Sequence, residues 1–198
     1  MAKVKLTKNE LKQQKDRLSR FKRYLPTLQL KKQQLQMVLR KVEAEEREKV
    51  KAREQQYQAM QAWIAVFAED VELDSLVKIE ELVTTDGNIA GIDIPVFEKI
   101  RFEDILWDLY DTPVWVDAAI DKMKEIMALD AEIRVLREQR DRIAEELRVT
   151  SQRVNLFEKV MIPETQENIR RIQIYLGDQQ TAQVVRGKFA KRKVERRA

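Results

Sequence analysis

The sequence has no cysteine and no histidine, and its 198 residues include only four glycines and four prolines. Without cysteine the chain can form neither a disulfide nor a thiolate site, a composition that fits a cytoplasmic protein. Without histidine it lacks the commonest zinc and iron ligand and the commonest general acid or base. The scarcity of glycine and proline removes the residues that most often interrupt a helix. These absences exclude most metal and acid–base chemistry and favour long helices.

Long hydrophobic runs are missing as well. No stretch of about 18 apolar residues exists that could form a membrane-spanning helix, and the polar N-terminus has no signal-peptide core. We therefore expect no direct membrane insertion, so that any membrane association would come through a partner. The segment 186–189, Arg-Gly-Lys-Phe, lacks the spacing of a phosphate-binding loop. The chain is thus expected to have no catalytic activity and no cofactor.

Charge is abundant and unevenly distributed. Charged residues make up 36% of the chain, a proportion typical of long helices and coiled coils. Residues 1–41 carry thirteen lysines and arginines against two acidic residues, and residues 186–198 carry seven against one. Residues 69–130 reverse this balance, with seventeen acidic residues against five basic ones. Both ends are therefore basic and the middle is acidic.

Apolar residues recur with a heptad period in two long arms, which predicts coiled-coil helices. In the N-terminal arm they are Leu11, Leu18, Phe21, Leu25, Leu28, Leu35, Leu39 and Val42, followed after a polar stretch by Val50, Tyr57, Met60, Ile64 and Phe67. In the C-terminal arm they are Ile126, Leu129, Ile133, Leu136, Ile143, Leu147, Val154, Phe157 and Met161, with Arg140 and Thr150 as polar interruptions, and a shifted series Ile169, Ile172 and Leu176 after Pro163.

The length of the arms decides the expected architecture. A helix of about 60 residues spans about 90 Å, whereas a compact globule of this size has a radius of gyration near 16 Å. We therefore expect a mainly α protein, in which a long antiparallel two-helix coiled-coil hairpin carries a small β-hairpin-containing tip in mid-sequence. The expected segments are an N-terminal helix over 1–69, the tip over 70–112, and a C-terminal helix with a basic tail over 113–198.

The tip segment is rich in turn and strand signals. Asp86-Gly87 predicts a hairpin turn between strands at 79–84 and 89–94, with 96–102 as a possible third strand. Residues 75–83 also fit a short helix. Pro95 predicts an edge strand or a bend, because proline cannot donate to a sheet ladder. At the start of the C-terminal arm, Thr112 is the expected N-cap and Pro113 the first helical residue.

Two segments resemble the D subunit of V-type and archaeal A-type rotary ATPases. Residues 88–98, "NIAGIDIPVFE", are similar to the family segment Asn-Val-Ala-Gly-Val-x-x-Pro-x-Phe-Glu. Residues 153–176, "RVNLFEKVMIPETQENIRRIQIYL", resemble a second family segment in register, including Pro163. Two departures from the family pattern are the ending "VVRGKFAKRK" and the proline in "KRYLPTLQLKK". The resemblance covers nearly the whole chain.

The resemblance implies that the chain is the central rotor shaft of a rotary ATPase and is not itself catalytic. Its helical hairpin would lie inside the ring of nucleotide-binding A and B subunits. Its middle region would face the small F subunit and the membrane-side C/d subunit of the rotor. The charge gradient then predicts that the basic ends face the ring. The expected partner-binding residues are Asn88, Gly91, Pro95, Phe97, Trp107, Lys3, Lys5, Lys8, Arg192 and Lys193.

Two other functions fit parts of the sequence. A homodimeric coiled-coil scaffold would pair the two apolar stripes between chains rather than within one. A nucleic-acid-binding helical hairpin would use the basic ends, but it would need stacking aromatics among them, and few are present. The three tryptophans, Trp63, Trp107 and Trp115, could form a small core at the tip or contact the F subunit.

The two prolines inside the arms carry a prediction of their own. If the chain folds back on itself near Ile94, Pro26 and Pro163 lie at the same level of the two arms. Each proline removes a backbone hydrogen bond from a helix interior. We therefore expect a joint kink or a change of supercoil at that level.

Overall fold

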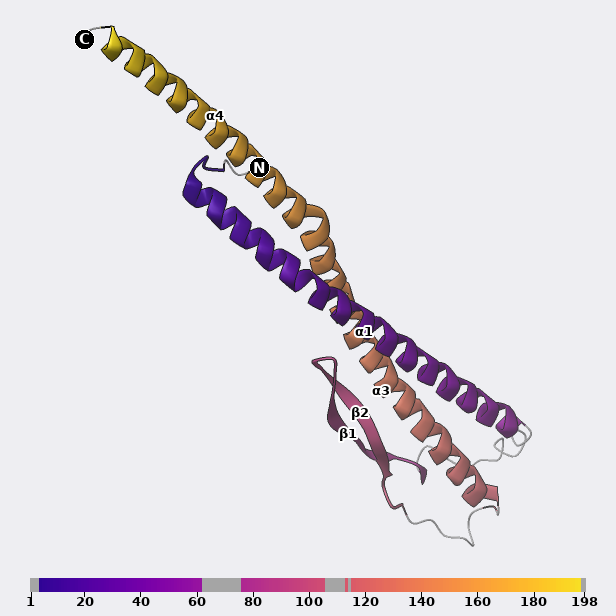
Figure 1. The fold of residues 1–198 in the computed structure, drawn as a ribbon. Coiled ribbons are helices and arrows are strands. Elements are labelled where there is room, and N and C mark those ends of the chain that lie inside the picture. Colours follow the sequence, from indigo (N-terminus) through magenta and orange to yellow (C-terminus); the bar gives the residue numbers. More distant parts are fainter. Residues whose placement is uncertain (1–3, 62–75, 106–112, 114, 197–198) are drawn as a thin grey trace. The chain divides into compact units, whose positions relative to one another are not determined.

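The protein is described by a computed structural model of residues 4–61, 76–105, 113 and 115–196. Its elements, shown in Figure 1, are α1 (Lys8–Gln61), β1 (Ile79–Ile89), β2 (Ile92–Phe102), α3 (Trp115–Leu156), the π-helix η2 (Phe157–Met161) and α4 (Ile162–Glu195). The expected mainly α protein with a mid-sequence β-hairpin is confirmed. Four residues for which the sequence predicts a role lie outside the described residues, namely Lys3, Trp63, Trp107 and Thr112.

The chain forms two compact units that cut across the three expected segments. One unit contains Met1–Lys32 together with Val149–Ala198, and the other contains Gln33–Arg148. Each unit therefore takes one part of α1 and one part of the C-terminal helices. This division follows the pairing of the helices rather than the order of segments along the chain.

In the unit Gln33–Arg148, α1 and α3 bury their predicted apolar stripes against each other. Leu35 and Val42 of α1 share a core cluster with Leu136 and Ile143 of α3, and all four are buried. Strand β2 adds Ile94, which is 1% exposed, to the same cluster. The two stripes thus pair within one chain, whereas the homodimeric scaffold required pairing between chains.

The hairpin turns at a different place from the one predicted. Strand β1 continues through Asp86 and Gly87, and the chain reverses at Ala90 and Gly91, whose φ angles are 55° and 78°. The predicted Asp-Gly turn is therefore wrong, and the segment 96–102 belongs to β2 rather than to a third strand. Gly87 is needed for the close packing of the two strands instead. A Cβ atom at this position would lie 2.7 Å from Cγ2 of Val96 on β2, which is too close for two carbon atoms.

The side chain of Asn88 explains the position of the turn. Its Nδ2 donates a hydrogen bond to Oδ1 of Asp93 (2.7 Å), and its Oδ1 accepts one from the backbone N–H of Gly91 (3.1 Å). These bonds stabilise a two-residue loop closed by the pair Ile89 and Ile92.

The turn geometry yields a stability prediction. Gly91→Ala should lower the free energy of unfolding by about 1 kcal/mol, because a Cβ atom is disfavoured at positive φ even where space is open. Gly177→Ala provides the matched control: Gly177 lies inside α4 with nothing within 4 Å of an added Cβ. There the same change should raise helix stability, by up to about 1 kcal/mol. Urea denaturation of both variants measures the difference, and equal shifts would contradict this account.

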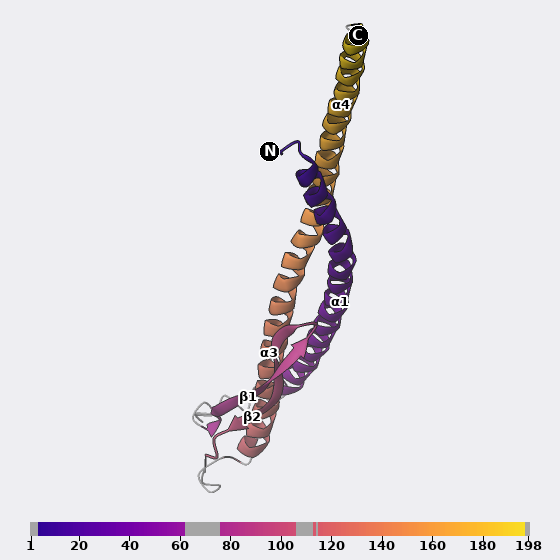
Figure 2. The same cartoon turned by 60° about the vertical axis from the view of Figure 1, so that its left-hand side comes forward.

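The second unit pairs the first part of α1 with the end of α3, η2 and α4. Thr7 caps α1, since its Oγ1 accepts a hydrogen bond from the N–H of Glu10 (3.2 Å). The rings of Phe21 and Phe157 meet edge to face, with centroids 5.2 Å apart. Figures 1 and 2 show that α4 continues past the start of α1. From Gly177 to Arg196 every residue of this unit is exposed.

The π-helix η2 stands directly before Pro163. The N–H of Ile162 donates to the carbonyl of Phe157, a bond that spans five residues instead of four. Beyond it, the hydroxyl of Thr165 donates to the carbonyl of Met161 (2.6 Å). Because a π turn holds an extra residue, it rotates everything that follows about the helix axis. This rotation accounts for the shift in the apolar stripe that the sequence shows after Pro163.

The predicted pairing of the two prolines is wrong. Phe21 contacts Phe157 in an antiparallel pair, so Pro26 and Pro163 lie on opposite sides of that contact. They are separated by about 11 residues along the axis, or about 16 Å. Pro163 instead lines a groove with Val4 and Leu6. The prediction assumed that residues at equal sequence distances before and after Ile94 lie opposite each other. The contact between Phe21 and Phe157 shows that they do not, because these residues lie at unequal distances from Ile94.

Candidate partner interfaces

The β-hairpin is fixed to α3 through strand β2. Besides the buried side chain of Ile94, two backbone carbonyls of β2 accept hydrogen bonds from α3. Nε2 of Gln139 donates to the carbonyl of Pro95 (2.6 Å), and Nη1 of Arg142 donates to the carbonyl of Asp93 (3.0 Å). Figures 1 and 2 show the hairpin beside α3 in both views. The hairpin is therefore joined to the helix pair by both apolar and polar contacts.

Four predicted partner-binding residues lie together on this hairpin, and each also has a role in the fold. Asn88 and Gly91 form the turn. The carbonyl of Pro95 accepts the hydrogen bond from Gln139, and Phe97 is half-buried. Their resemblance to the family segment is thus accounted for by hairpin geometry. Whether they contact a partner stays a prediction.

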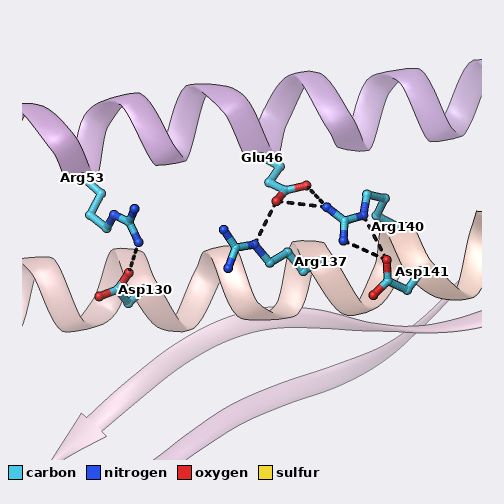
Figure 3. A network of polar contacts seen from close by, with 6 residues as sticks. All are labelled: Glu46, Arg53, Asp130, Arg137, Arg140 and Asp141. Atoms are coloured by element: carbon cyan, nitrogen blue, oxygen red, sulfur yellow. Dashed lines mark hydrogen bonds and ion pairs between the residues drawn. The ribbon is translucent and has the colours of Figure 1, made fainter.

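A series of ion pairs joins α1 to α3 where the apolar stripe of α1 is interrupted (Figure 3). Glu46 lies at its centre, and its carboxylate accepts from Nε of Arg137 and from Nη1 of Arg140, both at 2.9 Å. The side chain of Glu46 is only 13% exposed. On the same helix pair, Lys49 contacts Glu132 and Arg53 contacts Asp130, each at 2.8 Å.

Two arginines of this series, Arg140 and Arg53, are stabilised in the charged form. The hydrogen bonds that Arg140 donates to Asp141, followed by the charge of Glu46, raise the pKa of Arg140 above its ordinary value. The hydrogen bond that Arg53 donates to Asp130 raises the pKa of Arg53 in the same way. The guanidinium of Arg53 also lies 5.9 Å from the ring centroid of Tyr57. Arg53 and Arg140 are therefore positively charged at neutral pH.

Sequence reasoning missed this series because it treated the segment after Val42 only as a break in the apolar stripe. The available signal was charge complementarity between the two arms. Glu46 of the N-terminal arm lies opposite Arg137 and Arg140 of the C-terminal arm once the helices are paired. Arg140, interpreted from the sequence as a polar interruption, is therefore one of the two partners of Glu46.

The exposed end of α4 is a second candidate interface. Val185, Lys188, Phe189 and Arg192 follow one another at helical spacing and line one face of the helix. Phe189 is 65% exposed, an unusual position for a large aromatic side chain. Lys193 is exposed in the last turn, and Lys5 and Lys8 are exposed at the start of the same unit. The exposed end of α4 therefore presents basic groups together with uncovered apolar surface.

Within the parts of the chain that the structure describes, no helix is long and apolar enough to cross a membrane. No group of three or more carboxylates in those parts is arranged to hold a metal ion.

Comparison with known proteins identifies the family. The family model for the ATP synthase D subunit matches residues 10–192. The chain belongs to the ATP synthase D-subunit family. It is 53% identical over 193 residues to the V-type ATP synthase D subunit of Borreliella burgdorferi, covering 96% of this chain and 95% of that protein. It is 36% identical to the V-type ATP synthase D subunits of Chlamydia abortus and Chlamydia caviae, in each case over 98% of this chain and 95% of the relative.

The match extends over both units and over the hairpin. The family model begins within the first turns of α1 and ends in the last turn of α4, so it includes the ion-pair series and the exposed basic face. The two segments whose sequences resembled the D subunit correspond to the hairpin turn with β2, and to η2 with its flanking helices.

Proposed function

We propose that the chain is the central shaft of a V-type ATP synthase, which turns as one body and couples ATP chemistry in a nucleotide-binding ring to ion movement through the membrane. It is a non-catalytic subunit of that complex. The observation that carries the proposal is the family match over both helical arms. The paired stripes and interhelical ion pairs support it, because a shaft that transmits torque requires helices that do not slip past each other.

We further propose that the exposed end of α4 lies inside the ring formed by the A and B subunits. An isolated helix with an exposed Phe189 and a basic face has no partner among the described residues of this chain, and a surrounding ring would supply one. Exposed apolar side chains among basic ones are typical of a protein interface rather than of a free surface. The acidic middle of the chain then faces the F subunit and the membrane-side C/d subunit of the rotor.

Charge reversal in the last turn of α4 tests this orientation. Arg192→Glu combined with Lys193→Glu should reduce capture of the A and B subunits by the tagged chain about tenfold at low salt. Added salt should weaken the wild-type interaction too, because exposed charges are screened within about 10 Å at 0.1 M. Co-purification of the tagged chain from cells that express the whole complex measures the capture.

The matched control reverses two equally exposed charges elsewhere on the same chain. Lys41→Glu combined with Arg47→Glu changes side chains that are 78% and 80% exposed on α1. This control should leave capture of the ring subunits unchanged. If the α4 variant captures them as well as the wild type does at low salt, the proposed orientation is wrong. If the wild-type chain captures no ring subunits, the proposed function itself is wrong.

A further inference from the structure

The two strands of the hairpin have different outer edges. In a two-residue hairpin the closing pair, Ile89 and Ile92, is hydrogen-bonded, and such pairs then alternate with non-hydrogen-bonded ones. Asp93 and Pro95 therefore occupy positions whose backbone N–H and C=O groups point away from β1. These are the two carbonyls that accept hydrogen bonds from α3. The outer edge of β2 is covered by the helix.

Pro95 suits this edge because its position requires no N–H for the ladder. Proline lacks that group, so a proline in a hydrogen-bonded position would break the pairing with β1. At an outward-facing position the loss is harmless, and the carbonyl remains free for Gln139. The side chain of Gln139 is buried, with the residue only 7% exposed, so its amide is held in place by surrounding atoms.

Arg142 is oriented independently of the hairpin. Its Nη2 donates to Oε1 of Glu138, one turn earlier on α3, at 2.6 Å, while its Nη1 donates to the carbonyl of Asp93. Gln139 and Arg142, one turn apart on α3, thus donate hydrogen bonds to two alternate carbonyls of β2. An apolar contact such as that of Ile94 fixes where the strand lies, but directional hydrogen bonds also fix its angle to the helix.

We propose that Gln139 and Arg142 are positioning residues that hold the hairpin at a fixed angle on α3, the angle on which coupling in the assembled complex depends. The inference rests on the proposed function in one respect, namely that the hairpin meets a partner protein in the complex.

The angle of the hairpin can be measured in the isolated full-length chain. Because the sequence has no cysteine, Thr85→Cys and Ala118→Cys can carry two spin labels without background labelling. Both positions are exposed, one on β1 and one on α3. Gln139→Leu combined with Arg142→Met removes both donors while keeping side chains of similar length. The matched control, Gln152→Leu combined with Arg148→Met, makes the same changes at exposed positions of α3 and also removes one ion pair within the helix.

The double variant should broaden the distance distribution between the labels and leave the helical circular-dichroism signal unchanged. Amide hydrogens of Ile94 and Val96, which are paired with β1, should exchange about fivefold faster, or more, as expected for the loss of a hydrogen bond contributing about 1 kcal/mol. The control should change neither measurement. An unchanged distance distribution in the double variant would overturn the proposal, whatever the complex does.

The assembled complex then tests the consequence for function. Complexes containing the double variant should move fewer ions per ATP hydrolysed than complexes containing the control. If the hairpin loosens but this ratio stays at the wild-type value, the fixed angle has no functional role and that part of the proposal is wrong. Failure of the central-shaft function would be seen differently, as the absence of ring subunits bound to the wild-type chain.

Discussion

Ile94→Ala is expected to lower the free energy of unfolding by about 2–4 kcal/mol, the range for removing a fully buried aliphatic side chain. Ile94 is 1% exposed and lies in one cluster with Leu35 and Val42 of α1 and with Leu136 and Ile143 of α3. The loss is large because three elements meet at this side chain, so a cavity there weakens the helix pair and the attachment of the hairpin together. Urea denaturation followed by circular dichroism measures the change.

The control for this prediction is the same substitution on the neighbouring strand. Ile79 lies on β1 and is 45% exposed, so Ile79→Ala removes a side chain that is already largely in water. It should cost less than about 1 kcal/mol, as most exposed substitutions do. Similar losses for both variants would mean that the hairpin is not part of the core. A small loss for Ile94→Ala would mean that the cluster rearranges to fill the space.

The long helices and their buried faces could be predicted because their signal is repeated many times. The residues of the predicted stripes that are buried in the structure are Leu35, Val42, Ile126, Ile133, Leu136, Ile143, Val154 and Ile172. A heptad pattern sustained over several turns has few competing explanations. Tyr57, on the shifted part of the stripe, is 45% exposed, which shows that the pattern weakens where the ion pairs take over.

The hairpin turn was mispredicted because two local signals competed and tertiary packing decided between them. Asp86-Gly87 has the better turn composition, while Ala90 pays a conformational cost at φ 55°. The register that results places Ile94 against α1 and α3, and the burial of that side chain outweighs the strain at one residue. The residue types at the turn do not reveal whether the burial of Ile94 or the backbone strain at Ala90 has the larger free energy.

Which residues of the two arms lie opposite each other could not be predicted from the sequence either. Counting residues from Ile94 assumes equal connections on both sides and uniform helices. The structure has a two-stranded sheet in the connection and a π turn at Phe157–Met161, and both alter which residues meet. The polar contacts between arms depend on that pairing, so Glu46 could be identified as a central residue only once its partners were known.

Glu46→Arg is the second change expected to have a large effect, because it places three positive charges where one carboxylate now neutralises two guanidinium groups. The side chains of Glu46, Arg140 and Arg137 are 13%, 34% and 51% exposed, so solvent screens the repulsion in part. We expect a loss of about 1–3 kcal/mol in the free energy of unfolding, between the values for exposed and for buried ion pairs. Urea denaturation at low salt measures the loss.

A second charge reversal separates the ion pairs from other effects of placing an arginine at position 46. Adding Arg140→Glu to Glu46→Arg restores opposite charges across α1 and α3, although it also places a carboxylate beside Asp141, which Arg140 now contacts at 2.9 Å. The double variant should therefore recover part of the stability lost by Glu46→Arg alone, a coupling that independent sites do not show. In 1 M salt the loss and its recovery should both shrink, because the Debye length falls to about 3 Å. Additive losses for the two substitutions, unaffected by salt, would show that the charges do not hold the helices together here. Recovery at low salt would show that, where the apolar stripe is interrupted, complementary charge holds α1 against α3.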